Sequence, residues 1–461
     1  MELKKKSSFT GKIGFIISAA ASAVGVGNLW RFPYLAAQDG GGLFVLIYII
    51  GALTFGLSLL ITDVAIGRKT GKSSIHAYAE MGKKWKFLGI IACIIPAMII
   101  AYYPVIGGWI LKYIVTFISG QGELAADGGN YFGSFIASQS SVVYCVIFTI
   151  LTGIIVCIGV ENGIEKSSTI LMPILLVLLI MVAFYSLTLK SPDGTRTGLD
   201  GLKILLIPNL TGMTVSKFLQ VLLDAVTQLF FSLSVAMGIM ITYGSYMKKD
   251  NNIESSSVQV VIVDTVVAIL AGVMIIPAIY VFQGIEGMKA GPSLMFISLP
   301  MTFKAMGPIG IFVAIAFFIL ATFAALTSAI SLLEAVVANI MDITKKDRKV
   351  VAPICSIAYV ILAGIIALGY SNFYFEATFL GVVKGQLLDI FDYISNNVLM
   401  PFLTIFTAIL VGYVVKPQWI ISEVEIHDAK FKTKNIYKVL ITFVIPVVMT
   451  IILLKALTII K

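Results

Sequence analysis

An asparagine and an arginine stand beside two glycines inside an apolar stretch that is long enough to cross a membrane. Residues 22–33 read SAVGVGNLWRFP. In hydrocarbon, glycine loosens the backbone, and Asn28 and Arg31 are costly to desolvate, so a ligand or water has to compensate them. Where such a helix breaks, its free N–H groups attract an anion and its free carbonyl groups attract a cation. The stretch therefore predicts a site for a zwitterion bound beside Na⁺.

A second interruption falls in the sixth apolar stretch, where residues 230–232 read FFS and residues 234–238 read SVAMG. A single Gly-x-Gly would be explained by close helix packing. Two breaks with polar neighbours instead favour a cavity, because lipid offers the freed backbone groups no hydrogen bonds. Breaks in the first and sixth spans predict two five-helix repeats of inverted topology around a site in the middle of the membrane.

The composition places these elements in a membrane. Of the 461 residues, 59% are apolar and only 12% are charged, and the mean hydropathy is +1.00, far outside the range of soluble domains. A bilayer core of about 30 Å needs roughly 20 apolar residues per helix. We count eleven such runs, at 13–36, 42–66, 87–119, 141–159, 168–190, 216–246, 257–283, 308–341, 350–370, 377–415 and 436–459.

We therefore expect an all-α integral membrane protein with a single transmembrane domain over residues 1–461. The first five-helix repeat covers 13–190, the second, inverted repeat covers 216–415, and the eleventh helix at 436–459 is peripheral. Residues 191–215 and 284–307 mix Gly, Pro and charges with short apolar patches, so they are expected to form structured loops. Neither segment suggests a separate domain.

The net charge of +9 follows membrane topology rather than nucleic-acid binding. Lysines precede the first span and fill the loop after the second, whereas residues 120–141 contain no Lys or Arg. By the positive-inside rule the N-terminus is cytoplasmic, and eleven spans leave the C-terminus outside the cell's inner (plasma) membrane. Residues 4–23 imitate a cleavable signal peptide, but their removal would disrupt the most informative polar constellation in the chain, so we expect them to remain.

The cysteines and histidines exclude several other functions. Cys93, Cys145, Cys157 and Cys355 lie separately in apolar spans, and both histidines fall in loops, so no transition-metal site is expected. An intramembrane enzyme would need a nucleophile paired with a base, and none is evident. A channel would need a continuous polar pore, whereas the polar residues here gather at mid-membrane.

Four segments resemble the neurotransmitter:sodium symporter family, in particular its bacterial members with eleven spans. They are 23–33 (AVGVGNLWRFP), 228–238 (QLFFSLSVAMG), 324–328 (AALTS) and 388–392 (LDIFD). The resemblance covers nearly the whole chain. It implies two sodium sites built from carbonyl, hydroxyl, amide and carboxylate oxygens. The first would use Ala23, Asn28, Ser232 and Asp264 with the substrate carboxylate, and the second Ala21, Val24, Ala324, Thr327 and Ser328.

Asp264 departs from the animal members, which have asparagine there and use a bound chloride. The chloride constellation would comprise Tyr48, Gln228, Ser232, Asp264 and position 268, but Ala268 has no hydroxyl. We therefore expect transport that does not depend on chloride. A buried acid is retained only near a cation or proton, so a proton-coupled carrier of the same architecture remains an alternative.

The resemblance also implies how the substrate is held. Tyr103 would bind its carboxylate, Phe231 would close over it, and Tyr102 would only pack. The substrate-binding set is Ala23, Gly27, Ile99, Tyr103, Phe231, Ser232, Ser234, Met237, Ser328 and Leu332. Met237 leaves room for an aromatic ring, which favours an aromatic amino acid and tyrosine in particular; a leucine-sized cavity is the alternative.

Two charge pairs would gate this site. Arg31 and Asp392 would form the external gate, and Lys6 and Asp342 the cytoplasmic gate, with Phe9 and Tyr246 beside it. Asp63 would cap the unwound backbone of the sixth span. The sequence therefore predicts a sodium-coupled symporter that imports a large hydrophobic amino acid by alternating access. Its partners are the amino acid, sodium and the lipid bilayer, without nucleic acid, and a homodimer stays open.

Overall fold

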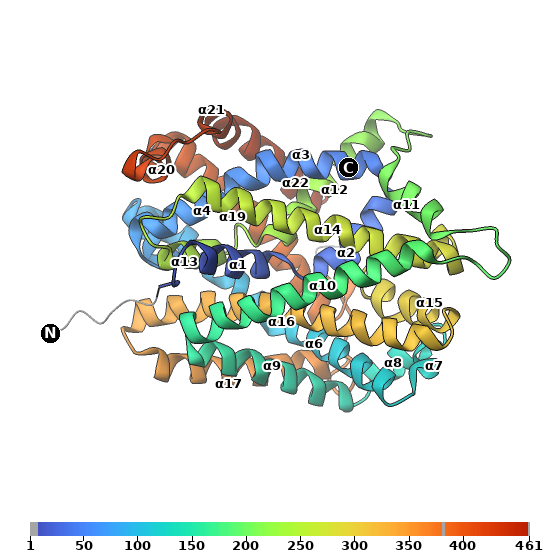
Figure 1. Ribbon diagram of the computed structural model, residues 1–461. Helices are drawn as coiled ribbons and strands as arrows, with labels where there is room; N and C mark the ends of the chain where they lie inside the picture. The colour runs from blue at the N-terminus through green and yellow to red at the C-terminus, as the bar shows by residue number, and fades with distance from the viewer. Residues whose placement is uncertain (1–7, 380–382, 460–461) are drawn as a thin grey trace.

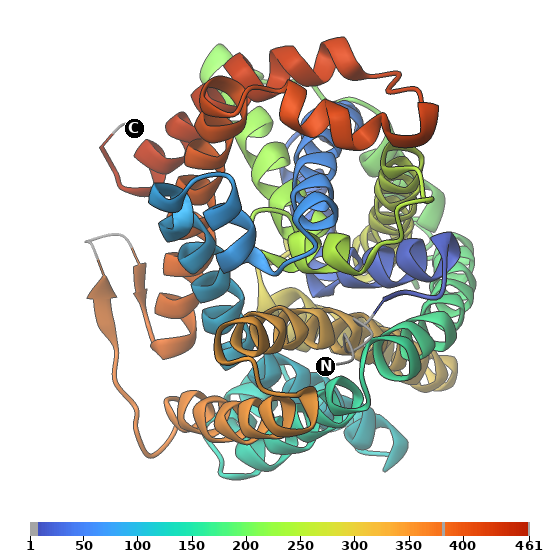
Figure 2. The same ribbon diagram turned by 90° about the vertical axis from the view of Figure 1, so that its left-hand side faces the viewer.

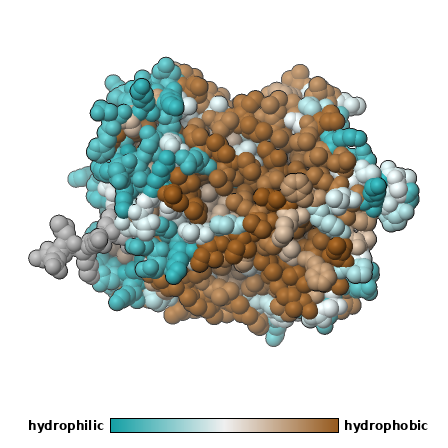
Figure 3. Space-filling model, viewed as in Figure 1, coloured by the Kyte–Doolittle hydropathy of each residue, from teal (hydrophilic) through white to brown (hydrophobic). Residues whose placement is uncertain are grey.

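The computed structural model describes residues 8–379 and 383–459, and it is a bundle of long, roughly parallel helices (Figures 1 and 2). A broad hydrophobic band covers the middle of the face shown in Figure 3, and hydrophilic residues gather toward the side where the chain begins. This is the distribution expected of a protein that crosses a bilayer. The all-α membrane class predicted from composition is confirmed.

The segment of residues 12–188 contains the helices of the first predicted repeat. Its elements are α1 (Lys12–Ala23), α2 (Val26–Gln38), α3 (Gly42–Gly51), η1 (Ala52–Gly56), α4 (Leu57–Thr70), α5 (Ser74–Glu80), η2 (Lys83–Trp85), α6 (Lys86–Ile118), α7 (Gly122–Ala125), α8 (Asn130–Ile136), α9 (Ser140–Ile158), η3 (Val160–Glu165) and α10 (Lys166–Thr188). The π-helical turns η1 and η3 continue into α4 and α10, so α3–α4 and η3–α10 are each single long spans.

The second half begins with a loop helix and then forms the remaining spans. Its elements are α11 (Gly198–Leu206), α12 (Val215–Leu233), α13 (Ile239–Tyr246), α14 (Ile253–Gln283), η4 (Ile285–Gly287), η5 (Leu294–Ser298), α15 (Leu299–Ala305), α16 (Pro308–Thr344), α17 (Arg348–Leu368), β1 (Ala377–Phe379), β2 (Val383–Gly385), α18 (Leu387–Asp392), η6 (Tyr393–Leu399), α19 (Met400–Ile409), η7 (Leu410–Val414), α20 (Gln418–Val424), η8 (Ile426–Asp428), α21 (Lys434–Val439), η9 (Leu440–Val444) and α22 (Ile445–Ala456).

One correction to the expected spans follows. The tenth span was expected over 377–415, but β1 and β2 pair antiparallel there, and the membrane-length helix begins at Leu387. The sequence did not reveal the hairpin, because β1 and β2 are only three residues each and lie within a longer apolar run. The helices of α11 and α15 fall in the two segments expected to be structured loops.

The number of spans depends on how the broken helices are joined. Nine helices in the described residues are long and apolar enough to cross a membrane, and the α1–α2 pair, bent by 56°, makes a tenth. The pair α12–α13, separated by residues 234–238, is the remaining candidate. Eleven spans, and the repeat boundaries within them, therefore stay predictions.

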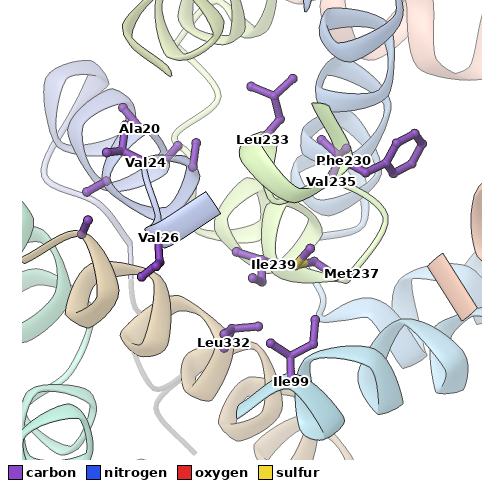
Figure 4. Packing of buried hydrophobic residues seen from close by; sticks show 14 of the residues in the cluster. Ala20, Val24, Val26, Ile99, Phe230, Leu233, Val235, Met237, Ile239 and Leu332 are labelled. Atoms are coloured by element: carbon purple, nitrogen blue, oxygen red, sulfur yellow. The ribbon is translucent and has the colours of Figure 1, made fainter. Parts of the chain in front are cut away.

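Both interruptions lie where the sequence placed them. The α1 helix ends at Ala23, and α2 restarts at Val26. Between α12 and α13, Ser234, Ala236 and Gly238 all adopt positive φ angles, which a continuous helix does not allow. Buried apolar side chains of both breaks, among them Val24, Val26 and Val235, pack in one core cluster (Figure 4).

Candidate functional site

A cavity of about 430 Å³ lies among four spans. Two are the interrupted spans α1–α2 and α12–α13, and two are the continuous helices α6 and α16. It reaches from Ser22 and Ser328 at the break in the first span to Asp392 at the start of the tenth. The predicted substrate residues that line it are Gly27, Ile99, Tyr103, Phe231, Ser234, Met237, Ser328 and Leu332. The predicted contacts Ala23 and Ser232 do not line it, and each side chain is 1% exposed.

Gly25 is the backbone position that lets two hydroxyl groups approach the break. A Cβ atom there would lie 2.9 Å from Ser328 Oγ and 3.6 Å from Tyr103 Oη. Only a residue without a side chain leaves this space free. Tyr103 from α6 and Ser328 from α16 therefore converge on the start of α2, whose first N–H groups have no partner within the helix and suit a carboxylate.

The end of the cavity opposite Gly25 is apolar. Ile99, Met237 and Leu332 contribute side chains from α6, from the break between α12 and α13, and from α16. Figure 4 shows these three side chains, together with Ile239, turned toward a common space. The cavity thus offers hydroxyl and N–H groups at one end and hydrocarbon and a thioether at the other.

A closed polar network lies behind the break, around Asp264 of α14. Asn28 Nδ2 donates to Asp264 Oδ1 at 2.9 Å and to Ser232 Oγ at 3.0 Å. Ser232 Oγ lies 2.7 and 2.8 Å from the two carboxylate oxygens, and Tyr48 Oη donates to Asp264 Oδ2 at 3.3 Å. All four side chains are at most 1% exposed. The network concentrates oxygen atoms and one carboxylate where a hard cation would be coordinated.

The expected chloride position offers little to an anion. Ala268 is fully buried and carries no hydroxyl. Gln228 Nε2 makes only a long 3.4 Å contact to the Gly27 carbonyl oxygen, and Gln228 Oε1 has no hydrogen-bond partner within residues 8–379 and 383–459.

The second predicted sodium site lies where the end of α1 meets α16. Ser328 Oγ donates to the Ser22 carbonyl oxygen at 3.1 Å, and Ser234 Oγ donates to the same oxygen at 2.9 Å. Ser22 was not among the predicted site residues. Because α1 stops at Ala23, its last carbonyl groups lack intrahelical partners, and the predicted ligands Ala21 and Val24 belong to this set.

The hydroxyl of Thr327 bonds back to its own helix. Its Oγ1 donates to the carbonyl oxygens of Phe323 at 2.9 Å and Ala324 at 3.2 Å. This is the ordinary behaviour of a helical threonine. The donated hydrogen leaves the oxygen lone pairs free, so the hydroxyl can still ligate a cation.

The proposed external gate residues do not form an ion pair in the described structure. Both line the cavity, but the guanidinium of Arg31 lies 4.4 Å from the ring centroid of Phe231, and its Nη1 is buried without a hydrogen-bond partner. Asp392 Oδ1 instead accepts from Tyr102 Oη at 2.6 Å and from Asn396 Nδ2 at 2.7 Å. The prediction that Tyr102 only packs was wrong.

The predicted cytoplasmic gate is described only in part, so the pairing of Lys6 with Asp342 stays a prediction. Lys6 lies outside the described residues, and Asp342 accepts hydrogen bonds from Ser73 N at 2.8 Å and Ser73 Oγ at 2.5 Å. Asp342 therefore stabilises the start of α5. Phe9 donates its N–H to the Tyr246 carbonyl at 3.1 Å, and their rings meet edge to face.

A buried ion pair that sequence reasoning missed lies beside these aromatic residues. Glu334 is fully buried in α16, and its two oxygens accept from Arg348 Nη1 and Nη2, each at 2.5 Å. Tyr246 Oη donates to Glu334 Oε1 at 2.6 Å, so the pair links α13, α16 and α17. An acid inside a long apolar helix was the available signal.

Asp63 connects α4 to the second break. Its Oδ2 accepts a hydrogen bond from the Ala236 N–H at 3.0 Å, and its side chain is buried. Ala236 has a positive φ, so its N–H cannot join a helical ladder. The carboxylate satisfies a donor that the break would otherwise strand in a low-dielectric interior.

Interrupted helices around a central cavity that is polar at one end and apolar at the other define the class of a multispanning membrane carrier. A family model described as the sodium:neurotransmitter symporter family matches residues 6–129 and 133–461. The chain belongs to this family. It is therefore a sodium symporter and not an enzyme, and the resemblance found in the four sequence segments is confirmed.

Individual relatives agree with this assignment. An uncharacterized sodium-dependent transporter, YhdH, of Bacillus subtilis is 34% identical over 87% of this chain and 86% of its own length. An uncharacterized sodium-dependent transporter of Haemophilus influenzae is 31% identical over 98% of this chain and 98% of its own length. The crystal structure of MhsT in complex with L-phenylalanine superposes with a TM-score of 0.84 at 35% identity, covering 98% of this chain and 100% of that one.

Proposed function

We propose that the protein couples the entry of Na⁺ to the uptake of a large hydrophobic amino acid, with an aromatic side chain and tyrosine favoured. The observation that carries this is the cavity at Gly25. There Tyr103, Ser328 and free helix N–H groups suit a carboxylate, while Ile99, Met237 and Leu332 suit an apolar side chain. The structure of MhsT with L-phenylalanine supports an amino acid of this kind.

Sodium is proposed to bind at two sites. The first comprises Ala23, Asn28, Ser232 and Asp264 with the substrate carboxylate, so each ligand strengthens binding of the other. The second comprises Ala21, Val24, Ala324, Thr327 and Ser328. Each Na⁺ that enters down the membrane potential contributes about 2.3 kcal/mol per 100 mV. This is sufficient to accumulate substrate without any covalent chemistry.

The transport cycle is proposed to alternate between two gates. Substrate and sodium enter the cavity while Arg31 and Asp392 are apart, and pairing of these two charges then excludes water from above. Release to the other side requires the contacts of Glu334, Arg348 and Tyr246 to open. With the N-terminus in the cytoplasm and the C-terminus outside the inner (plasma) membrane, this order of events imports the amino acid.

Purified protein in liposomes tests the proposal. Uptake of labelled tyrosine, tryptophan, phenylalanine and leucine is measured with an inward Na⁺ gradient, with Na⁺ replaced by choline, and with chloride replaced by gluconate. We expect uptake that is lost in choline and unchanged in gluconate. Uptake that persists in choline and follows a proton gradient would instead establish the proton-coupled alternative.

A further inference from the structure

A recess beside the last helix is not part of the transport pathway. It has a volume of about 320 Å³ and lies where the end of η7 and the start of α20 meet α21 and η9. Its lining includes Lys416 and Gln418 from one side and Lys438, Val439 and Phe443 from the other. Neither Asn28 nor any other residue of the central site contributes to it.

The recess sits at the edge of the membrane-spanning band. Lys416 follows directly after the span Leu387–Val414, and Lys438 lies in the first turns of the span Lys434–Ala456. Both spans reach this edge on the side of the molecule where the chain begins, which is also the more hydrophilic side (Figures 1 and 3). A molecule in the recess would therefore occupy the headgroup level of one leaflet.

The walls below the two lysines face lipid. The side chains of Val439 and Phe443 are 54% and 62% exposed, and Tyr413 beside them is 54% exposed. The helices approach closely here, since Tyr413 Oη donates to the Thr442 carbonyl oxygen at 2.7 Å, and a Cβ at Gly412 would lie 3.2 Å from Thr442 Cα. The recess thus has a cationic end at the membrane surface. Its other end, further into the membrane, is apolar and in contact with acyl chains.

The charges in the recess are not neutralised by the protein. Within the described residues, neither Lys416 nor Lys438 forms an ion pair, and no carboxylate lines the recess. The nearby Lys434, by contrast, is paired with Glu425 at 2.9 Å. Ordinary interfacial lysines extend individually toward water. Here two of them, from different spans, meet over one hollow, and Lys438 is half-buried.

We propose that this recess binds the headgroup of an anionic phospholipid. The phosphodiester accepts hydrogen bonds from Lys416 and Lys438, and one acyl chain runs along Val439 and Phe443. Charge complementarity selects an anionic over a zwitterionic lipid, and the apolar wall selects a lipid over a free phosphate ion. The bound lipid joins the peripheral last helix to the end of the tenth span.

Native mass spectrometry of the detergent-purified protein tests this directly, with phosphatidylglycerol, phosphatidylcholine and inorganic phosphate as separate probes. We expect phosphatidylglycerol to bind more tightly than phosphatidylcholine. Lys416→Gln and Lys438→Gln should each weaken phosphatidylglycerol binding roughly fivefold, and the double variant roughly twentyfold. The matched control is Lys349→Gln, which removes an exposed lysine at the start of α17 and should leave binding unchanged.

Three outcomes would overturn the proposal. The double variant could retain wild-type affinity, Lys349→Gln could weaken binding as much as Lys438→Gln, or inorganic phosphate could displace the lipid at millimolar concentration. The third result would assign the recess to a soluble anion. Sodium-dependent amino acid uptake by the double variant, measured in liposomes, shows that the variant is folded, because neither lysine touches the central cavity.

Discussion

Ser328 of α16 donates a hydrogen bond to the carbonyl oxygen of Ser22 at 3.1 Å, and so bridges a continuous helix to the open end of a broken one. Ser234 from the second break reaches the same oxygen at 2.9 Å. A cation bound among these oxygens would take the place of the hydrogen bonds that now join them. The two interrupted spans and α16 thus meet at one carbonyl group.

Replacing Ser328 with alanine is expected to weaken sodium binding. The variant removes one proposed ligand, and a hydrogen bond to a charged group contributes about 1.5–3 kcal/mol, or roughly tenfold to a hundredfold in affinity. Sodium-dependent binding of labelled substrate measures it. Thr322→Ala is the control, because Thr322 lies on the same helix, bonds to the Phe318 carbonyl and does not line the cavity. Equal losses in both variants would point to a general defect in α16.

Gly25→Ala is expected to block substrate binding. The added methyl group would lie 2.9 Å from Ser328 Oγ and intrude on the space in front of Tyr103. Overpacking of this kind costs about 1–3 kcal/mol, so the apparent affinity should fall roughly tenfold or more. Equilibrium binding of labelled tyrosine at saturating Na⁺ provides the measurement. Gly133→Ala, whose Cβ would meet nothing within 4 Å, should bind normally.

Asp264→Asn is expected to impair uptake in chloride-free medium. The substitution removes the carboxylate that bonds to Asn28 and Ser232, so the proposed cation would lose its fixed counter-charge. Combining it with Ala268→Ser adds the missing hydroxyl, and chloride should then restore part of the uptake. Liposome uptake in chloride and in gluconate distinguishes these cases. If the single variant transports normally in gluconate, Asp264 does not provide the charge balance.

Glu334→Gln is expected to loosen the contacts among α13, α16 and α17. Removing one partner of a buried ion pair leaves Arg348 uncompensated and costs about 3–5 kcal/mol. Thermal unfolding in detergent should show a lower Tm. In a Tyr246→Cys background, adding Glu334→Gln should make the introduced thiol more reactive toward a soluble thiol reagent.

The double variant Glu334→Gln with Arg348→Gln is the appropriate control, since it leaves no buried charge. It should be more stable than the single variant. A single variant with wild-type Tm and unchanged reactivity at position 246 would show that the pair does not hold this side closed.

Met237→Phe is expected to shift selectivity toward smaller side chains. The ring would fill the apolar end of the cavity opposite Ile99 and Leu332. Because a methylene in such a pocket is worth about 1–3 kcal/mol, tryptophan uptake should fall by roughly tenfold or more relative to leucine. Competition of each amino acid against labelled substrate measures this ratio. An unchanged ratio would mean that Met237 does not contact the substrate side chain.

Local sequence was sufficient for the helices and their interruptions. Apolar runs define most spans, and the glycines and polar residues near Gly25 and Gly238 mark the two breaks, because a helix cannot leave backbone groups unpaired in lipid. Asn28, Ser232 and Asp264, which the family resemblance grouped together, do meet in one hydrogen-bonded network, and their role as cation ligands stays a prediction. The short hairpin at β1 and β2 was not, since it lies inside an apolar run that reads as part of a helix.

Which side chains meet across the bundle was decided only by tertiary structure. Tyr102 and Asp392 are 290 positions apart, and their hydrogen bond depends on how α6 is rotated toward α18. The same holds for Glu334, which pairs with Arg348 and Tyr246 on different helices. A sequence determines where a helix can exist in a membrane through the cost of exposed polar groups. The rotation and contacts of each helix arise from packing among all of them, and no short segment contains that information.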